Sequence, residues 1–81
     1  SHPSLLPKYP GAHAVRDALL AQETETGCTI HWVDSGLDTG PIITQVAVPI
    51  HPGDTETKLH ERIKIVERKL IVATINQILG A

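Results

Sequence analysis

Two side chains of this 81-residue chain have the chemistry of an acid–base pair, His2 and Asp38. Imidazole exchanges protons near neutral pH, and a carboxylate beside it stabilises and orients the protonated ring. His2 stands in a loop that Pro3, Pro7 and Pro10 stiffen, because proline fixes φ and disfavours α conformation at the preceding residue. Residue type alone also allows structural roles, a histidine in a frayed terminus and an aspartate that caps a turn.

Other residues could take part in binding. Lys64 and Glu67 lie three positions apart on an expected helix, where an ammonium could face a phosphate and a carboxylate could accept hydrogen bonds from ribose. The alternative is a surface ion pair of little energetic value. Cys28 is more typical of a small core residue than of a nucleophile, and His31 is interpreted as structural or as supporting the site. The five histidines show no zinc-motif spacing, so no metal site is expected.

The charge and composition of the chain argue against two classes of partner, nucleic acids and membranes. The net charge of −2 and the lack of a basic run argue against nucleic acid. Tyr9 and Trp32 alone cannot form a platform on which bases stack. No apolar run is long enough to cross a membrane, and a single cysteine fits a reducing compartment. We therefore expect a cytoplasmic protein that binds neither nucleic acid nor membrane.

Periodicity predicts the elements that must position these residues. A helix is expected over 13–21, strands over 28–33 and 42–48, and a long helix from Asp54 or Thr55 to about Leu79. The apolar stripe of the long helix comprises Leu59, Ile63, Val66, Leu70 and Ala73. Further apolar residues widen it in the second half, which predicts deeper packing there: Ile65, Ile71, Val72 and Ile75.

The order loop, helix, strand, strand, helix predicts an α/β fold with an incomplete sheet, because two strands and two helices leave edges and apolar faces uncovered. The chain lacks an initiator methionine and begins inside a motif, so we expect a piece of a larger domain. Its partners would be the upstream half of the same domain or a second copy in a homodimer. Alone, it should be poorly stable.

Five stretches resemble the phosphoribosylglycinamide formyltransferase family: HPSLLP (2–7), GCTIH (27–31), LDTGPII (37–43), GDT (53–55) and ERIKIVE (61–67). The resemblance covers this whole chain but only the C-terminal part of the family's domain. Residues 1–81 are thus expected to form the C-terminal portion of a Rossmann-like formyltransferase domain. The shorter SLLP and LDTG elements are shared with methionyl-tRNA formyltransferase and formyltetrahydrofolate hydrolases, whereas HPSLLPKYPG and the last helix favour the glycinamide enzyme.

The resemblance implies formyl transfer from 10-formyltetrahydrofolate to glycinamide ribonucleotide in purine synthesis, without a metal. His2 and Asp38 match the family's catalytic pair, and Pro3, Lys64 and Glu67 match substrate-binding positions. The folate-binding loop corresponds to Val33, Asp34, Ser35, Gly36, Leu37, Asp38, Thr39 and Gly40.

Other readings of the sequence stay open. A formyltetrahydrofolate hydrolase would use the same pair with water as acceptor. A non-catalytic packing or interaction module would leave the apolar faces for a partner. The family's asparagine two residues before the histidine would precede Ser1, and its phosphate loop lies further upstream. The chain alone is therefore expected to be inactive.

Overall fold

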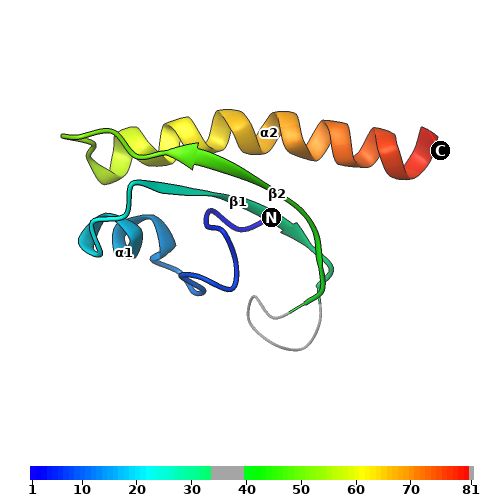
Figure 1. The fold of residues 1–81 in the computed structure, drawn as a ribbon. Coiled ribbons are helices and arrows are strands. Elements are labelled where there is room, and N and C mark those ends of the chain that lie inside the picture. Colours follow the sequence, from blue (N-terminus) through cyan, green and yellow to red (C-terminus); the bar gives the residue numbers. More distant parts are fainter. Residues whose placement is uncertain (34–39, 81) are drawn as a thin grey trace.

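The structure, a computed structural model, describes residues 1–33 and 40–80. Its elements are α1 (Ala14–Leu20), β1 (Glu25–His31), β2 (Ile42–Pro49) and α2 (Glu56–Gly80) (Figure 1). They follow the Pro-rich loop 1–11 in the predicted order, so the expected α/β class with an incomplete sheet is confirmed.

The sheet is a single antiparallel ladder of β1 and β2. Glu25 lies opposite Pro49 and Cys28 opposite Val46, with an irregularity between Ile30 and His31. The first strand therefore begins and ends earlier than the predicted range 28–33. Its polar start pairs with β2 regardless of weak strand propensity, since cross-strand contacts decide what a strand contains.

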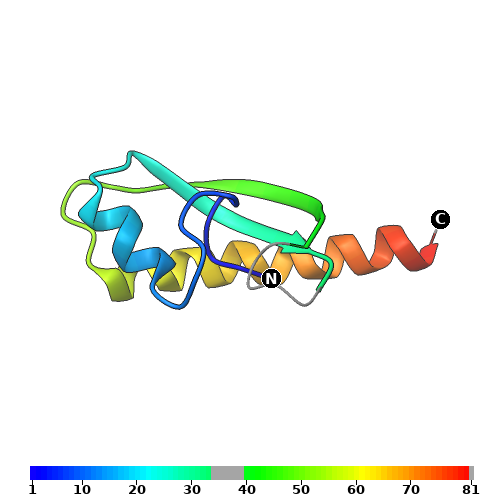
Figure 2. The same ribbon diagram turned by 90° about the horizontal axis from the view of Figure 1, so that it is seen from below.

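Both faces of β1 are covered. The side chain of Cys28 is fully buried in a core with Leu59 and Ile63 of α2, and Thr29 is fully buried beneath the Pro-rich loop. In Figures 1 and 2, α2 lies along one side of the ladder and the Pro-rich loop lies on the other. Helix α1 contacts α2, and its Val15 belongs to the same core as Leu59 and Ile63. β1 is thus the central layer, and the loop that carries His2 rests directly on it.

The hydrogen bonds at the start of α2 show which of the two predicted residues, Asp54 or Thr55, caps the helix. The hydroxyl of Thr55 accepts a hydrogen bond from the backbone N–H of Lys58 at 3.1 Å, which satisfies one otherwise unpaired donor of the first turn. Asp54 accepts instead from the backbone N–H of His51 at 2.8 Å. Thr55 is therefore the cap, and Asp54 holds the preceding turn.

Helix α2 is packed more deeply in its first half than in its second, the reverse of the prediction from the sequence. Leu59 and Ile63, in its first half, are fully buried. In the second half Val72 is 59% exposed and Ile75 is 49% exposed, so the prediction of deeper packing there is wrong. Figure 1 gives the reason, because the helix runs on past the end of the short two-stranded ladder.

Candidate functional site

His2 is fixed to β1 through its backbone. Its N–H donates to the carbonyl of Thr29 at 2.8 Å, and the N–H of Thr29 donates back at 2.9 Å, an isolated antiparallel bridge. The residue is only 6% exposed. The alternative role, a histidine in a frayed terminus, therefore does not fit the structure.

The imidazole of His2 has a defined tautomer. Its Nε2 lies 2.8 Å from the carbonyl oxygen of Tyr9, and a carbonyl can only accept, so Nε2 carries a proton. The buried Ser4 hydroxyl donates to the carbonyl of Lys8 at 2.6 Å and lies 3.2 Å from the same Tyr9 oxygen. The proton that distinguishes imidazole from imidazolium is then the one on Nδ1.

A second set of hydrogen bonds holds the loop on the sheet. The hydroxyl of Thr29 donates to the carbonyl of Ser4 at 2.7 Å and accepts from the N–H of Leu6 at 3.1 Å. The side-chain amide of Gln45, on β2, donates to Thr29 Oγ1 at 3.0 Å and to the carbonyl of Leu6 at 2.7 Å. One residue from each strand therefore binds the loop on the C-terminal side of His2.

The predicted partner of His2 cannot be placed. Asp38 lies outside the described residues, with the rest of the expected folate loop from Asp34 to Thr39, so the approach of Asp38 to His2 stays a prediction. Of that loop, the structure describes Val33, which is 91% exposed, and Gly40, which is buried.

The residues that flank positions 34–39 lie close together. The N–H of Trp32 donates to the carbonyl of Pro41 at 2.9 Å. A Cβ on Gly40 would lie 1.6 Å from the Trp32 carbonyl oxygen and 3.3 Å from Nδ1 of His31. Gly40 is therefore required to be glycine by this close approach, and Nδ1 of His31 lies 3.1 Å from the same carbonyl oxygen of Trp32.

The predicted substrate residues on α2 are half-buried, and so is Pro3. Lys64 Nζ lies 3.3 Å from a carboxylate oxygen of Glu61, so its ion pair among the described residues is with Glu61 and not with Glu67. The charge of Glu67 adds to burial in raising the pKa of the Cys28 thiol, which keeps that thiol neutral. Cys28 is thus a core residue, as the sequence predicts.

The family description "Formyl transferase" matches residues 1–75. The chain belongs to the formyl transferase family.

Similar proteins within this family are enzymes of purine biosynthesis by name. The phosphoribosylglycinamide formyltransferase of Mycobacterium tuberculosis (strain ATCC 25618 / H37Rv) is 55% identical over 75 residues, which is 93% of this chain and 35% of that protein. The trifunctional purine biosynthetic protein adenosine-3 of Drosophila melanogaster is 63% identical over 62 residues, which is 76% of this chain and 5% of that protein.

A solved structure shows the same fold. The phosphoribosylglycinamide formyltransferase from Bacillus halodurans matches with a TM-score of 0.91 and 51% identity, over 96% of this chain and 40% of that one. The chain thus spans well under half the length of these similar proteins.

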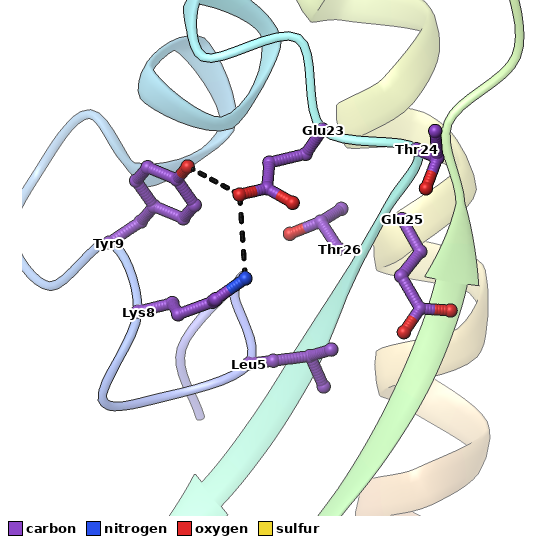
Figure 3. A pocket seen from close by; sticks show the side chains of 7 residues that line it. All are labelled: Leu5, Lys8, Tyr9, Glu23, Thr24, Glu25 and Thr26. Atoms are coloured by element: carbon purple, nitrogen blue, oxygen red, sulfur yellow. Dashed lines mark hydrogen bonds and ion pairs between the residues drawn. The ribbon is translucent and has the colours of Figure 1, made fainter.

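This formyl transferase chain has a small pocket between the Pro-rich loop and the start of β1. The volume is about 230 Å³, and Figure 3 shows its lining, Leu5, Lys8, Tyr9, Glu23, Thr24, Glu25 and Thr26. The hydroxyl of Tyr9 donates to Glu23 at 2.9 Å and Lys8 lies 3.4 Å from the same oxygen, and both lower the pKa of Glu23. The hydroxyl of Thr26 is buried and has no hydrogen-bond partner among the residues that the structure describes. None of these residues is a predicted site residue.

Within residues 1–33 and 40–80, no three side chains of the His, Cys, Asp and Glu types gather closely enough to hold a metal ion. No helix in the same ranges has the length and apolarity needed to cross a bilayer.

The sequence reasoning missed Ser4, Thr29 and Gln45. Their partners lie elsewhere in the fold, as in the contacts of Thr29 with Leu6 and of Gln45 with Leu6. A period-2 pattern places Thr29 on one face of a strand, but nothing local indicates that this face is covered by a loop. The one available signal is that Ser4 and Thr29 lie inside the stretches that resemble the family.

Proposed function

We propose that this chain carries the catalytic histidine of a phosphoribosylglycinamide formyltransferase, which transfers the formyl group of 10-formyltetrahydrofolate to the amino group of glycinamide ribonucleotide. The observation that carries the proposal is His2, a buried imidazole of defined tautomer within the HPSLLP stretch. The names of the similar proteins support the reaction class.

The chemistry proceeds by addition and elimination. The substrate amine attacks the formyl carbon, which forms a C–N bond and leaves an oxyanion and a cationic nitrogen. The imidazolium of His2 donates from Nδ1 to the oxyanion, and Asp38 stabilises the charged ring. The amine then loses a proton, the folate nitrogen gains one, and the bond between that nitrogen and the formyl carbon breaks.

Binding is proposed for three parts of the chain. The backbone of residues 33–40 contacts the folate, and the close approach of Gly40 to Trp32 supports such a loop. Lys64 and Glu67 contact the phosphate and ribose of the nucleotide, and Pro3 borders it. Residues 1–81 are the C-terminal part of one formyltransferase domain, whose upstream half completes the site, and the enzyme is cytoplasmic.

The test is a double-mutant cycle in a complete formyltransferase domain that contains these 81 residues. Asp38→Asn keeps the shape of the side chain and removes the charge, and His2→Ala removes the imidazole. Each should lower kcat by roughly 10²–10⁴-fold. The double variant should be little worse than the more damaged single variant, because the residues act as a unit.

His51→Gln, which removes an exposed imidazole in the turn before α2, is the matched control and should retain turnover. Near-normal turnover in Asp38→Asn, or strictly additive losses, would show that the pair does not act together. Release of formate from the folate in the absence of the nucleotide, at the full rate, would identify a hydrolase instead.

A further inference from the structure

Gln45 binds the Pro-rich loop by donating two hydrogen bonds from its side-chain amide. The single proton of the Thr29 hydroxyl is used toward the Ser4 carbonyl at 2.7 Å, so Thr29 Oγ1 can only accept from Gln45. The Leu6 carbonyl also only accepts. The Gln45 amide supplies both hydrogens from one nitrogen, which fixes its orientation without ambiguity.

These bonds connect Gln45 to the histidine in two steps. Gln45 holds Thr29, and Thr29 exchanges two backbone hydrogen bonds with His2, at 2.8 and 2.9 Å. Gln45 also holds the carbonyl of Leu6, whose N–H is bound to the same Thr29 hydroxyl at 3.1 Å. The stretch from His2 to Leu6 is therefore pinned to the sheet at both ends.

We propose that Gln45 is a positioning residue for His2. The inference rests on the proposed function, and it assigns to a residue on the second strand a role in holding the imidazole at the reacting carbon. Loss of its amide leaves the Leu6 carbonyl without this donor and Thr29 Oγ1 with one partner fewer, so the loop can shift on the sheet. Misplacement of a catalytic group by about 1 Å can cost 10²-fold in rate.

The first test compares steady-state kinetics in a complete formyltransferase domain that contains this chain. Gln45→Glu keeps the shape but places an acceptor against the Leu6 carbonyl, and Gln45→Leu removes the polar group. Both should lower kcat by about 10- to 100-fold. KM for glycinamide ribonucleotide should stay near its normal value, because Gln45 contacts the loop and not the nucleotide. Gln77→Glu and Gln77→Leu make the same changes on the exposed end of α2 and should leave kcat unchanged.

The second test does not require activity. Amide hydrogen exchange should accelerate at His2 and Leu6 in both Gln45 variants and stay unchanged in both Gln77 variants. Unchanged exchange at His2 and Leu6 would overturn the proposal, as would normal kcat. Equal acceleration throughout the domain, with kcat and KM altered together, would also overturn it in favour of a general loss of stability.

The two readouts separate this inference from the proposed function. A complete domain with no formyl transfer in its unaltered form would refute the proposed function. Exchange at His2 and Leu6 would then still decide whether Gln45 holds the loop.

Discussion

A carboxylate and a guanidinium join the end of β2 to the early turns of α2. Arg62 donates from Nη1 and Nη2 to the two oxygens of Asp54, at 2.6 and 2.9 Å, and from Nη1 to the carbonyl of Pro49 at 3.0 Å. Only 5% of the Asp54 side chain is exposed. A two-pronged contact of this kind needs arginine, because lysine offers a single charged nitrogen.

Because of the pair formed by Asp54 and Arg62, the free energy of unfolding should depend on pH in the acid range. The hydrogen bonds from Arg62, and then that from the His51 N–H, hold the pKa of Asp54 well below its usual range. A lowered folded-state pKa stabilises the fold above the unfolded pKa of about 4, and that stability is lost as the pH falls further. We therefore expect the free energy of unfolding to fall below about pH 4, and to fall less steeply in Asp54→Asn.

Urea unfolding at a series of pH values measures this dependence, in a complete formyltransferase domain that contains the chain. Arg62→Lys is the companion variant, since it keeps the positive charge and loses the two-pronged contact with Asp54. It should also make the free energy of unfolding depend less steeply on pH. Asp17→Asn is the matched control, because Asp17 pairs on the surface with the adjacent Arg16. Parallel profiles for Asp54→Asn and the unaltered protein would contradict the prediction.

At the scale of the elements, Gly27 sets how closely β1, β2 and the Pro-rich loop approach. A Cβ at this position would lie 2.2 Å from the carbonyl oxygen of Val46 and 2.6 Å from Cδ2 of Leu5. The Leu5 side chain could move, but the backbone carbonyl of β2 could not do so without opening the ladder. Glycine is needed at position 27 because there is no room for a side chain, and not because of its backbone conformation.

Gly27→Ala should accordingly lower the free energy of unfolding by about 1–3 kcal/mol, the usual cost of overpacking. Gly80→Ala is the matched control. Apart from its chain neighbours and the backbone of its own helix, no described atom lies within 4 Å of the added carbon. The residue also ends a helix, so stability should be unchanged or slightly higher. Denaturant midpoints of the two variants give the comparison, and equal midpoints would contradict the close-packed interface.

The sequence predicts these elements unevenly, for physical reasons. The four elements and their order follow from local periodicity, and the stripe through Leu59 and Ile63 identifies the buried face of α2. The extra length of β1 at Glu25 could not be predicted, because it depends on pairing with Pro49. The exposure of Val72 could not be predicted either, because apolar periodicity does not reveal where the covering sheet ends.

The residues of the candidate site also differ in whether the sequence could predict them. His2 is a candidate from its residue type and the prolines around it, and its catalytic role is a prediction from the resemblance of HPSLLP to the family. The residues that hold it could not be recognised in this way, because the bond from Gln45 to Leu6 joins positions 39 apart in the sequence. Asp38 remains a prediction from resemblance, since the structure does not describe its segment.

At the scale of the whole molecule, α2 extends far beyond the layers that it covers. Its 25 residues span roughly 37 Å at 1.5 Å per residue, and the whole molecule is 41 Å along its longest axis. The helix is thus nearly as long as the molecule, and the large apolar residues exposed in its second half are Val72, Ile75, Ile78 and Leu79. Such a surface favours association with an apolar partner.

We therefore expect the isolated 81-residue chain to self-associate. Replacing both Val72 and Ile75 by Glu should raise the dissociation constant more than tenfold, since burial of one such side chain contributes roughly 1.5–3 kcal/mol. Sedimentation velocity over a range of concentrations measures the change. Gln77→Glu, on the same part of the helix, adds a charge without removing an apolar group and should alter association little. A monomer at all concentrations would contradict the prediction.

The complete burial of Cys28 makes its thiol a probe for opening of the core. A thiol with no exposed surface and a raised pKa cannot react with a disulfide reagent in the closed state. The single cysteine therefore reacts only when the core around it, which includes Val15, Leu59 and Ile63, opens. The absorbance change from a colour-forming thiol reagent, at a concentration at which labelling outpaces closing, would thus measure the average rate at which the layer beneath the His2 loop opens.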